Sequence, residues 1–287
     1  MARQINKRMW FFAVLLPLVL FCPWARAVEI AKTAQYSVVE LTFKGPVQDP
    51  KNVPKRNIDF RARFRHESGS PEYKVYGFWD GDGKGGTTGG VFKIRFCPTK
   101  AGRWDIVEVY SNKSKLNGQK QGQYVTAVAS EHRGFWVVDS KSPGHRWYMR
   151  SDGSHQYIFG NTHYTFLSGY QNGDKPSGND IAADIAGNAK YFKKLRFSLY
   201  GGRYVNPKEK PFFDNDGNLS DSGGNSHRPN PRWFNRRADL AVQTAWEHDL
   251  IADLILCGPD TKESRSVLRA GNNGGDPAPY LKYIAAR

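Results

Sequence analysis

The hydrophobic pattern of this 287-residue chain changes near residue 146, and this change limits the folds that it can adopt. Before that point, short alternating or aromatic-rich runs are separated by Gly, Pro, Asn and Asp. After it, short apolar runs alternate with segments of helical periodicity. The first pattern predicts an all-β fold, whereas strand-helix alternation predicts a parallel sheet. We therefore expect a multidomain protein with a β-sandwich domain over residues 28–145 and a β/α region over residues 146–287.

The front region contains seven candidate strands in about a hundred residues, which is the size of an immunoglobulin-like β-sandwich. These strands are Tyr36–Phe43, Ile58–His66, Tyr73–Trp79, Phe92–Phe96, Trp104–Tyr110, Gln123–Ala129 and Gly134–Val138. Within Phe60–Arg65, the period of two places two phenylalanines and an alanine on one face and three arginines on the other. One face of the sheet is therefore predicted to be core and the other to be solvated.

Two features of the front region allow a functional interpretation beside a structural one. The arginines of the run Phe60–Arg65 could bind an acidic or sulfated polymer, because guanidinium groups form paired hydrogen bonds with such anions, or they could form an ordinary solvated face. The acidic, glycine-rich run Asp80–Gly86 resembles a calcium loop, but Val91 occupies the place of the final glutamate ligand, which favours a hairpin turn. No nucleic-acid motif accompanies the basic charge, so we expect no nucleic-acid partner.

The back region is predicted to contain three β/α units. The candidate strands are Tyr157–Thr162, Phe197–Tyr200 and Ala252–Cys257, the last of them buried on both faces, and the candidate helices are Asp180–Leu195, Pro231–Asp249 and Pro277–Arg287. A hairpin that pairs Arg146–Met149 with Gln156–Phe159 is expected to precede them. A (β/α)8 barrel, or TIM barrel, needs eight units in about 250 residues. We therefore expect an incomplete (β/α)8 TIM-barrel-type segment that stops after about three units.

Residues 1–27 have the form of a secretory signal peptide. Basic residues precede the apolar run Met9–Cys22, and Ala25-Arg26-Ala27 fits a cleavage site. The run is shorter than the roughly 20 residues of a membrane span, so we expect a secreted or periplasmic protein without stable membrane insertion. The segment holds four basic and no acidic residues, so its removal lowers the formal net charge from +15 to +11.

The sequence offers no cofactor or metal motif. Once Cys22 is removed with the signal peptide, Cys97 and Cys257 remain, in regions that we expect to fold separately, which argues against a disulfide framework. No nucleophile elbow or zinc-binding helix is found, and Glu247-His248-Asp249 is interpreted as a solvated helix end. We expect no cofactor and no metal ion.

Diffuse motifs along most of the chain carry a family resemblance. The front motifs are Tyr36–Phe43, Gly77–Gly81, Arg95–Pro98 and Gly102–Trp104, and the back motifs are Phe159–Tyr164, Tyr191-Phe192, Trp233-Phe234 and Asp253–Leu256. The front region resembles the β-sandwich domain of unknown function that precedes secreted glycoside-hydrolase-like barrels. The back region is similar to the apiosidase-like barrel that follows it.

The resemblance implies polysaccharide degradation, but it places the acid/base glutamate and the second carboxylate on later barrel strands, beyond Arg287. Glycoside hydrolysis usually needs both carboxyl groups, so we name no catalytic residue and expect this chain to be inactive, although the family that it resembles consists of glycoside hydrolases. The remaining candidates for a binding site are residues that follow the three strands, because (β/α)8 barrels build their active sites at the carboxyl ends of their strands. We predict that these residues bind oligosaccharide or polysaccharide: Asn161, His163, Tyr164, Arg203, Tyr204, Asn206 and Asp260.

A different hypothesis, also compatible with the sequence, is a non-catalytic carbohydrate- or matrix-binding protein. In that case the aromatic and arginine-rich β-sandwich would hold the ligand, including acidic or sulfated chains. A third hypothesis makes the sandwich a spacer that packs on the barrel.

Overall fold

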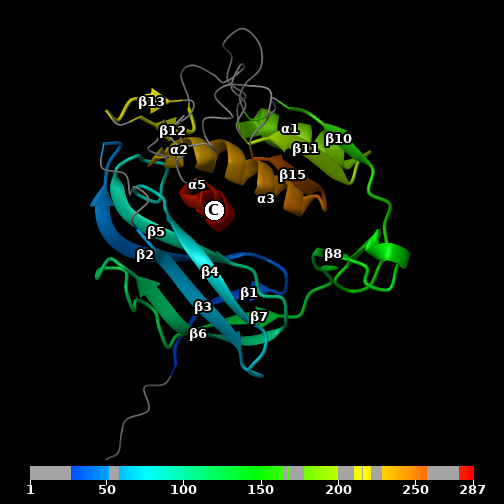
Figure 1. Ribbon diagram of the computed structural model, residues 1–287, viewed down its shortest axis with the longest axis horizontal. Helices are drawn as coiled ribbons and strands as arrows, with labels where there is room; N and C mark the ends of the chain where they lie inside the picture. Colours follow the sequence, from blue (N-terminus) through cyan, green and yellow to red (C-terminus); the bar gives the residue numbers. More distant parts are fainter. Residues whose placement is uncertain are drawn as a thin grey trace, which may run out of the picture.

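The computed structural model describes residues 27–51, 58–164, 167, 178–199, 210–214, 216–220, 228–256 and 278–287. Strands dominate, as predicted (Figure 1). They form a seven-stranded sheet, a three-stranded parallel sheet, a small three-stranded sheet and a two-stranded hairpin. Among the described residues, no helix has the length and apolar character needed to cross a membrane.

The large sheet has the strand order β1-β7-β6-β3-β4-β5-β2. Its strands are β1 (Glu29–Ala34), β2 (Val39–Gln48), β3 (Phe60–His66), β4 (Glu72–Trp79), β5 (Gly89–Phe96), β6 (Gly102–Ser111) and β7 (Tyr124–Val128). The edge strands β1 and β2 approach each other, so the sheet is nearly a closed barrel. β1 pairs with β7 in parallel, and the other pairs are antiparallel.

The predicted strands are present, but the two separate sheets of a sandwich are not distinguished among the described strands. The reason lies in β4, whose first part pairs with β3 through Tyr76 and whose last part, Gly77–Trp79, pairs with β5. This strand therefore joins the two halves into one sheet. β1 was not predicted from the sequence, and the run Gly134–Val138 lies outside the large sheet, in the hairpin described below.

The interior of the large sheet follows the predicted period of two. Phe60, Ala62 and Phe64 are buried, and the ring of Phe64 stacks on that of Phe96 at a centroid distance of 4.0 Å. Gly77 is required beside this layer, because a Cβ atom there would lie 2.3 Å from the Phe60 ring. The burial of each large apolar side chain contributes about 1.5–3 kcal/mol of transfer free energy, so this layer is a main source of stability.

The back region contains the predicted parallel sheet, in the order β10-β11-β15. Its strands are β10 (Gly160–Thr162), β11 (Lys194–Ser198) and β15 (Ile251–Ile255). Helix α1 (Gly178–Ala189) connects the first two strands, and a longer helical segment precedes the third. That segment consists of α2 (Pro231–Trp233), the π-helical stretch η3 (Phe234–Asp239) and α3 (Leu240–Glu247).

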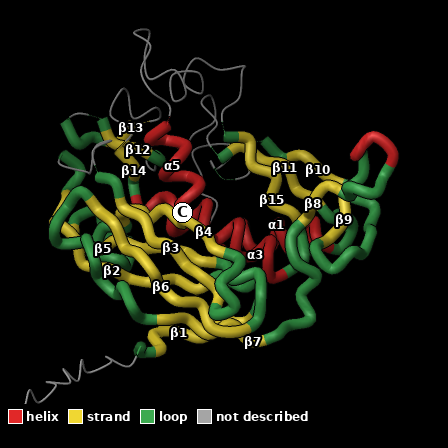
Figure 2. The backbone as a smooth tube through the Cα atoms, turned by 60° about the horizontal axis from the view of Figure 1, so that its bottom comes forward, coloured by secondary structure: helices red, strands yellow, loops and turns green. Residues whose placement is uncertain are grey.

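The described helices α1 and α3 lie on one face of the parallel sheet (Figure 2). Leu195 and Phe197 of β11 are buried in the same cluster as Ile181 and Ile185 of α1. We predicted that the third strand is buried on both faces, and this is wrong for its described residues, which are all only partly buried. On one face Leu254 lines a cavity, and on the other face Asp253 pairs with Lys194 at 3.1 Å, so neither face of β15 is fully covered.

The remaining elements are short. β8 (Trp136–Val138) pairs with β9 (Tyr148–Arg150) around the 3-10 turn η1 (Pro143–His145), so the predicted pairing of Arg146–Met149 with Gln156–Phe159 is wrong. β12 (Phe212–Phe213), β13 (Leu219–Ser220) and β14 (Arg228–Pro229) form the small sheet. Helix α5 (Ala278–Ala286) packs on β4, between the large sheet and α3 (Figures 1 and 2).

Candidate functional site

The parallel sheet brings the carboxyl ends of β10 and β11 to one edge. The His163 backbone N–H donates to the Arg196 carbonyl at 2.9 Å, and the Ser198 N–H donates to the Tyr164 carbonyl at 3.2 Å. His163 and Tyr164, two predicted site residues that follow β10, therefore lie beside the second strand, and both side chains are exposed, Tyr164 by 59%. This edge exposes the side chains of His163 and Tyr164 to a ligand.

Asn161 has a different position. Its Nδ2 donates to Asn188 Oδ1 at 2.9 Å, and its Oδ1 accepts from the Thr162 N–H at 2.8 Å. The side chain therefore ties β10 to α1, which orients the strand end. The other predicted site residues, Arg203, Tyr204, Asn206 and Asp260, lie outside the described residues.

The arginine face of β3 is balanced by acidic side chains. Arg63 pairs with Glu72 and Glu108, at 3.2 and 2.6 Å, and Arg65 pairs with Glu72 at 2.6 Å. Arg61 pairs with Asp59 and also lies over the Tyr110 ring. Hydrogen bonds from Arg65 lower the pKa of Glu72, which keeps its carboxylate charged. An anionic polymer would have to compete with these ion pairs for the guanidinium groups.

The loop at Asp80–Gly86 is the predicted hairpin between β4 and β5. The exposed carboxylate of Asp82 accepts the backbone N–H groups of Lys84 and Gly86, both at 2.7 Å, and these bonds lower its pKa. The carboxylate is thus used to shape the turn. No group of three or more potential metal ligands is found in the described part of the chain.

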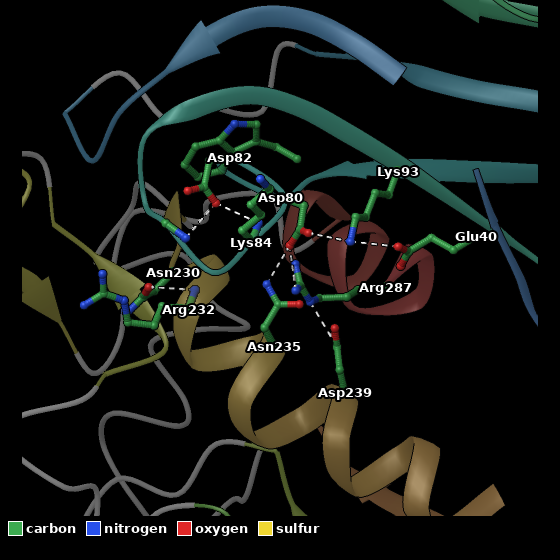
Figure 3. A network of polar contacts seen from close by, with 12 residues as sticks. Glu40, Asp80, Asp82, Lys84, Lys93, Asn230, Arg232, Asn235, Asp239 and Arg287 are labelled. Atoms are coloured by element: carbon green, nitrogen blue, oxygen red, sulfur yellow. Dashed lines mark hydrogen bonds and ion pairs between the residues drawn. The ribbon is translucent and has the colours of Figure 1, made fainter. Parts of the chain in front are cut away.

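Asp80, at the start of that loop, is fully buried and joins the large sheet to α5 and η3 (Figure 3). Its Oδ2 pairs with Lys93 Nζ at 2.8 Å. Its Oδ1 accepts from Arg287 at 2.8 Å and from Asn235 Nδ2 at 2.9 Å. Burial opposes the charge on Lys93, but Asp80 and Glu40 outweigh it and raise the pKa of that amine. The arrangement is a satisfied ionic network that holds three elements together.

A second carboxylate extends this network. Asp239 of η3 pairs with Arg287 Nε at 3.0 Å and with Arg95 at 2.8 Å. Arg95 also pairs with Glu40 at 3.0 Å, so each guanidinium bridges two acidic residues. The hydroxyl of Tyr283 accepts from Arg287 at 2.7 Å, and burial raises the pKa of this phenol. Sequence reasoning did not find this network, because its members are far apart along the chain.

A cavity of about 500 Å³ lies beside the network, where the start of β2, the end of β5, helix α3 and helix α5 meet. Its lining is mostly apolar and includes Phe234, Val242, Trp246, Leu254 and Ile284. The sequence analysis missed it and interpreted Glu247-His248-Asp249 as a solvated helix end. The signal was the spacing of Val242 and Trp246, which are four residues apart and therefore share an outward face of α3.

At the rim of this cavity, aromatic rings of the front region and of the back region contact each other. The Trp246 indole and the His132 imidazole lie with their centroids 3.9 Å apart, and Tyr36 also contacts His132. Burial and the charge of Arg150 lower the pKa of His132. The imidazole is therefore neutral at neutral pH. Cys97, elsewhere in the large sheet region, is a half-buried thiol whose pKa burial raises to about 11, which makes it unreactive.

Fold and site together define a β-rich protein with a nearly closed sheet and a packed β/α region. Residues 32–111, which cover β2 to β6, match the family described as "Domain of unknown function (DUF5060)". The chain thus contains such a domain in its large sheet, as the resemblance had implied for this region. No curated protein and no solved structure matches the chain.

Proposed function

We propose that this chain is an exported, glycoside-hydrolase-like protein that binds polysaccharide at the carboxyl edge of its parallel sheet. In this proposal, the nearly closed sheet is the sandwich-type domain that precedes a (β/α)8 barrel, and β10, β11 and β15 are barrel strands. The observation that carries the proposal is the parallel register, which sets His163 and Tyr164 beside the end of β11. Parallel β/α enzymes bind their substrates at this edge.

The chemistry of the edge suits a sugar. The exposed Tyr164 ring offers an apolar face and a hydroxyl, and the neighbouring His163 side chain is also exposed at this edge. The exposed edge residues placed here, His163 and Tyr164, include no carboxyl group. We therefore propose that they contribute substrate binding, and we assign them no step in bond cleavage.

The test measures retention of the purified chain in native gels that contain soluble neutral plant or algal polysaccharides. We expect His163→Ala/Tyr164→Ala to weaken binding by about tenfold, since each lost hydrogen bond or ring contact contributes about 0.5–1.5 kcal/mol. Tyr157→Ala is the matched control, because Tyr157 is 82% exposed but precedes β10 and so lies toward the other end of the strand. Equal retention of wild type and the double variant would refute the proposal.

The alternative of a polyanion-binding front region has less support, because the arginines of β3 are paired with acidic residues. The same gels with a sulfated polysaccharide test it. Retention that falls by about fivefold in Arg63→Gln, while His163→Ala/Tyr164→Ala changes nothing, would favour this alternative over the edge site.

A further inference from the structure

The cavity beside α3 has the size and wall chemistry of a ligand site. Its volume of about 500 Å³ lies within the range of about 300–1,000 Å³ that is usual for small-molecule pockets. One wall is formed by Val242 and Trp246 of α3, and Leu254 of β15 and Ile284 of α5 also line it. Val242 and Trp246 are 41% and 37% exposed, and both lie on the same face of α3, so this apolar wall is accessible to a ligand.

The opposite wall is polar, but its charges are already neutralised. Glu40 uses one carboxylate oxygen for Lys93 and the other for Arg95. Asp239 uses its two oxygens for Arg95 and Arg287. Both guanidinium groups therefore face carboxylates, and a charged ligand would find no free counter-ion on this wall. The wall still offers hydrogen-bond acceptors, because each carboxylate oxygen has more than one lone pair.

Gln243 and Glu247 complete the polar part of the lining. Gln243 Nε2 donates to Glu247 Oε1 at 3.0 Å, and both side chains are exposed. The two acidic and two basic side chains of the opposite wall cancel in charge, so Glu247 leaves the lining with one net negative charge. This charge disfavours the binding of an anion. Size, apolar walls and acceptors without a free cation together select a neutral ligand that has both a C–H face and hydroxyl donors.

We propose that this cavity is a binding site for a neutral sugar of disaccharide size, with a pyranose ring packed against Trp246. Such a ring presents C–H groups on its face and hydroxyl donors at its edge, which matches the two walls. The cavity is lined from α3 and α5 and also by Leu199, which follows β11, but neither His163 nor Tyr164 lines it. The cavity proposal and the proposed function have the class of ligand in common, but they involve different residues.

The experiment titrates the purified full chain with cellobiose, xylobiose and mannobiose, by calorimetry and by saturation-transfer NMR. We expect at least one disaccharide to bind, with the strongest saturation on its ring C–H protons. Trp246→Ala should weaken that binding at least tenfold. Val242→Trp, which adds volume at an exposed position and so spares the core, should abolish it. Trp147→Ala is the matched control, because Trp147 is 65% exposed on the β8-β9 hairpin, outside the lining.

Two results would overturn the proposal: no binding of any of the three disaccharides, or binding that Val242→Trp leaves unchanged. His163→Ala/Tyr164→Ala separates this proposal from the proposed function. Disaccharide binding that survives in that double variant and is lost in Val242→Trp supports the cavity site. Disaccharide binding that is lost in the double variant and kept in Val242→Trp assigns the sugar to the strand-end edge and rejects the cavity site.

Discussion

Asp80→Ala tests the ionic network between the large sheet and α5. In the wild type, Asp80 is fully buried and accepts from Lys93, Arg287 and Asn235. The Arg287 side chain is only 2% exposed and that of Lys93 only 12%, so neither cation can turn to water. Removal of the carboxylate leaves both cations with one acidic neighbour fewer.

Loss of one partner from a buried ion pair costs about 3–5 kcal/mol. Here the cost falls near the lower end, about 3 kcal/mol, because Arg287 keeps Asp239 and Lys93 keeps Glu40. A change of about 3 kcal/mol shifts an opening equilibrium by about two orders of magnitude. Helix α5 docks through this pair, so we expect the opening to be local and to expose residues 278–287 first.

Hydrogen exchange measured by mass spectrometry should show residues 278–287 exchanging about a hundredfold faster in Asp80→Ala. Asp82→Ala is the matched control, because Asp82 is an exposed carboxylate in the same loop that bonds only to backbone N–H groups of that loop. Asp80→Leu combined with Arg287→Met should restore slow exchange in part, because an apolar pair replaces the buried Asp80–Arg287 pair at little cost, whereas Lys93 still has one acidic neighbour fewer. Exchange within threefold of wild type in Asp80→Ala would refute the assignment of this network as the contact that holds α5.

Three further predictions concern the free energy of unfolding, measured by urea titration. His132 has a lowered pKa, so the unfolded chain binds its proton more readily; stability should decline from pH 7.5 to 5, and His132→Gln should decline less. A wild-type decline no larger than that of the variant would contradict this. Gly77→Ala should destabilise by about 1–3 kcal/mol because of the close Phe60 ring. Gly187→Ala in α1, where a Cβ meets no atom, should stabilise by about 0.5–1 kcal/mol, and destabilisation there would be the contrary result.

Sequence reasoning located the edge residues because they follow a strand directly. The run that ends at Thr162 is apolar and short, so the next residues, His163 and Tyr164, had to leave the sheet at its carboxyl end. The same reasoning could not find the pair of Asp80 and Arg287, which are 207 positions apart. No local sequence pattern predicts which loop packs against which helix when the two are so far apart along the chain.

The sequence by itself determined some of the local elements of this protein, among them β3 and α1. A period of two in Phe60–Arg65 and a helical period around Ile181 and Ile185 depend only on backbone geometry and on which side chains avoid water. Tertiary structure decided how the strands join, because β4 passes from β3 to β5 and makes one nearly closed sheet. It also decided where α5 lies, and with it the buried charges and the cavity, since these depend on contacts between segments that are distant in the chain.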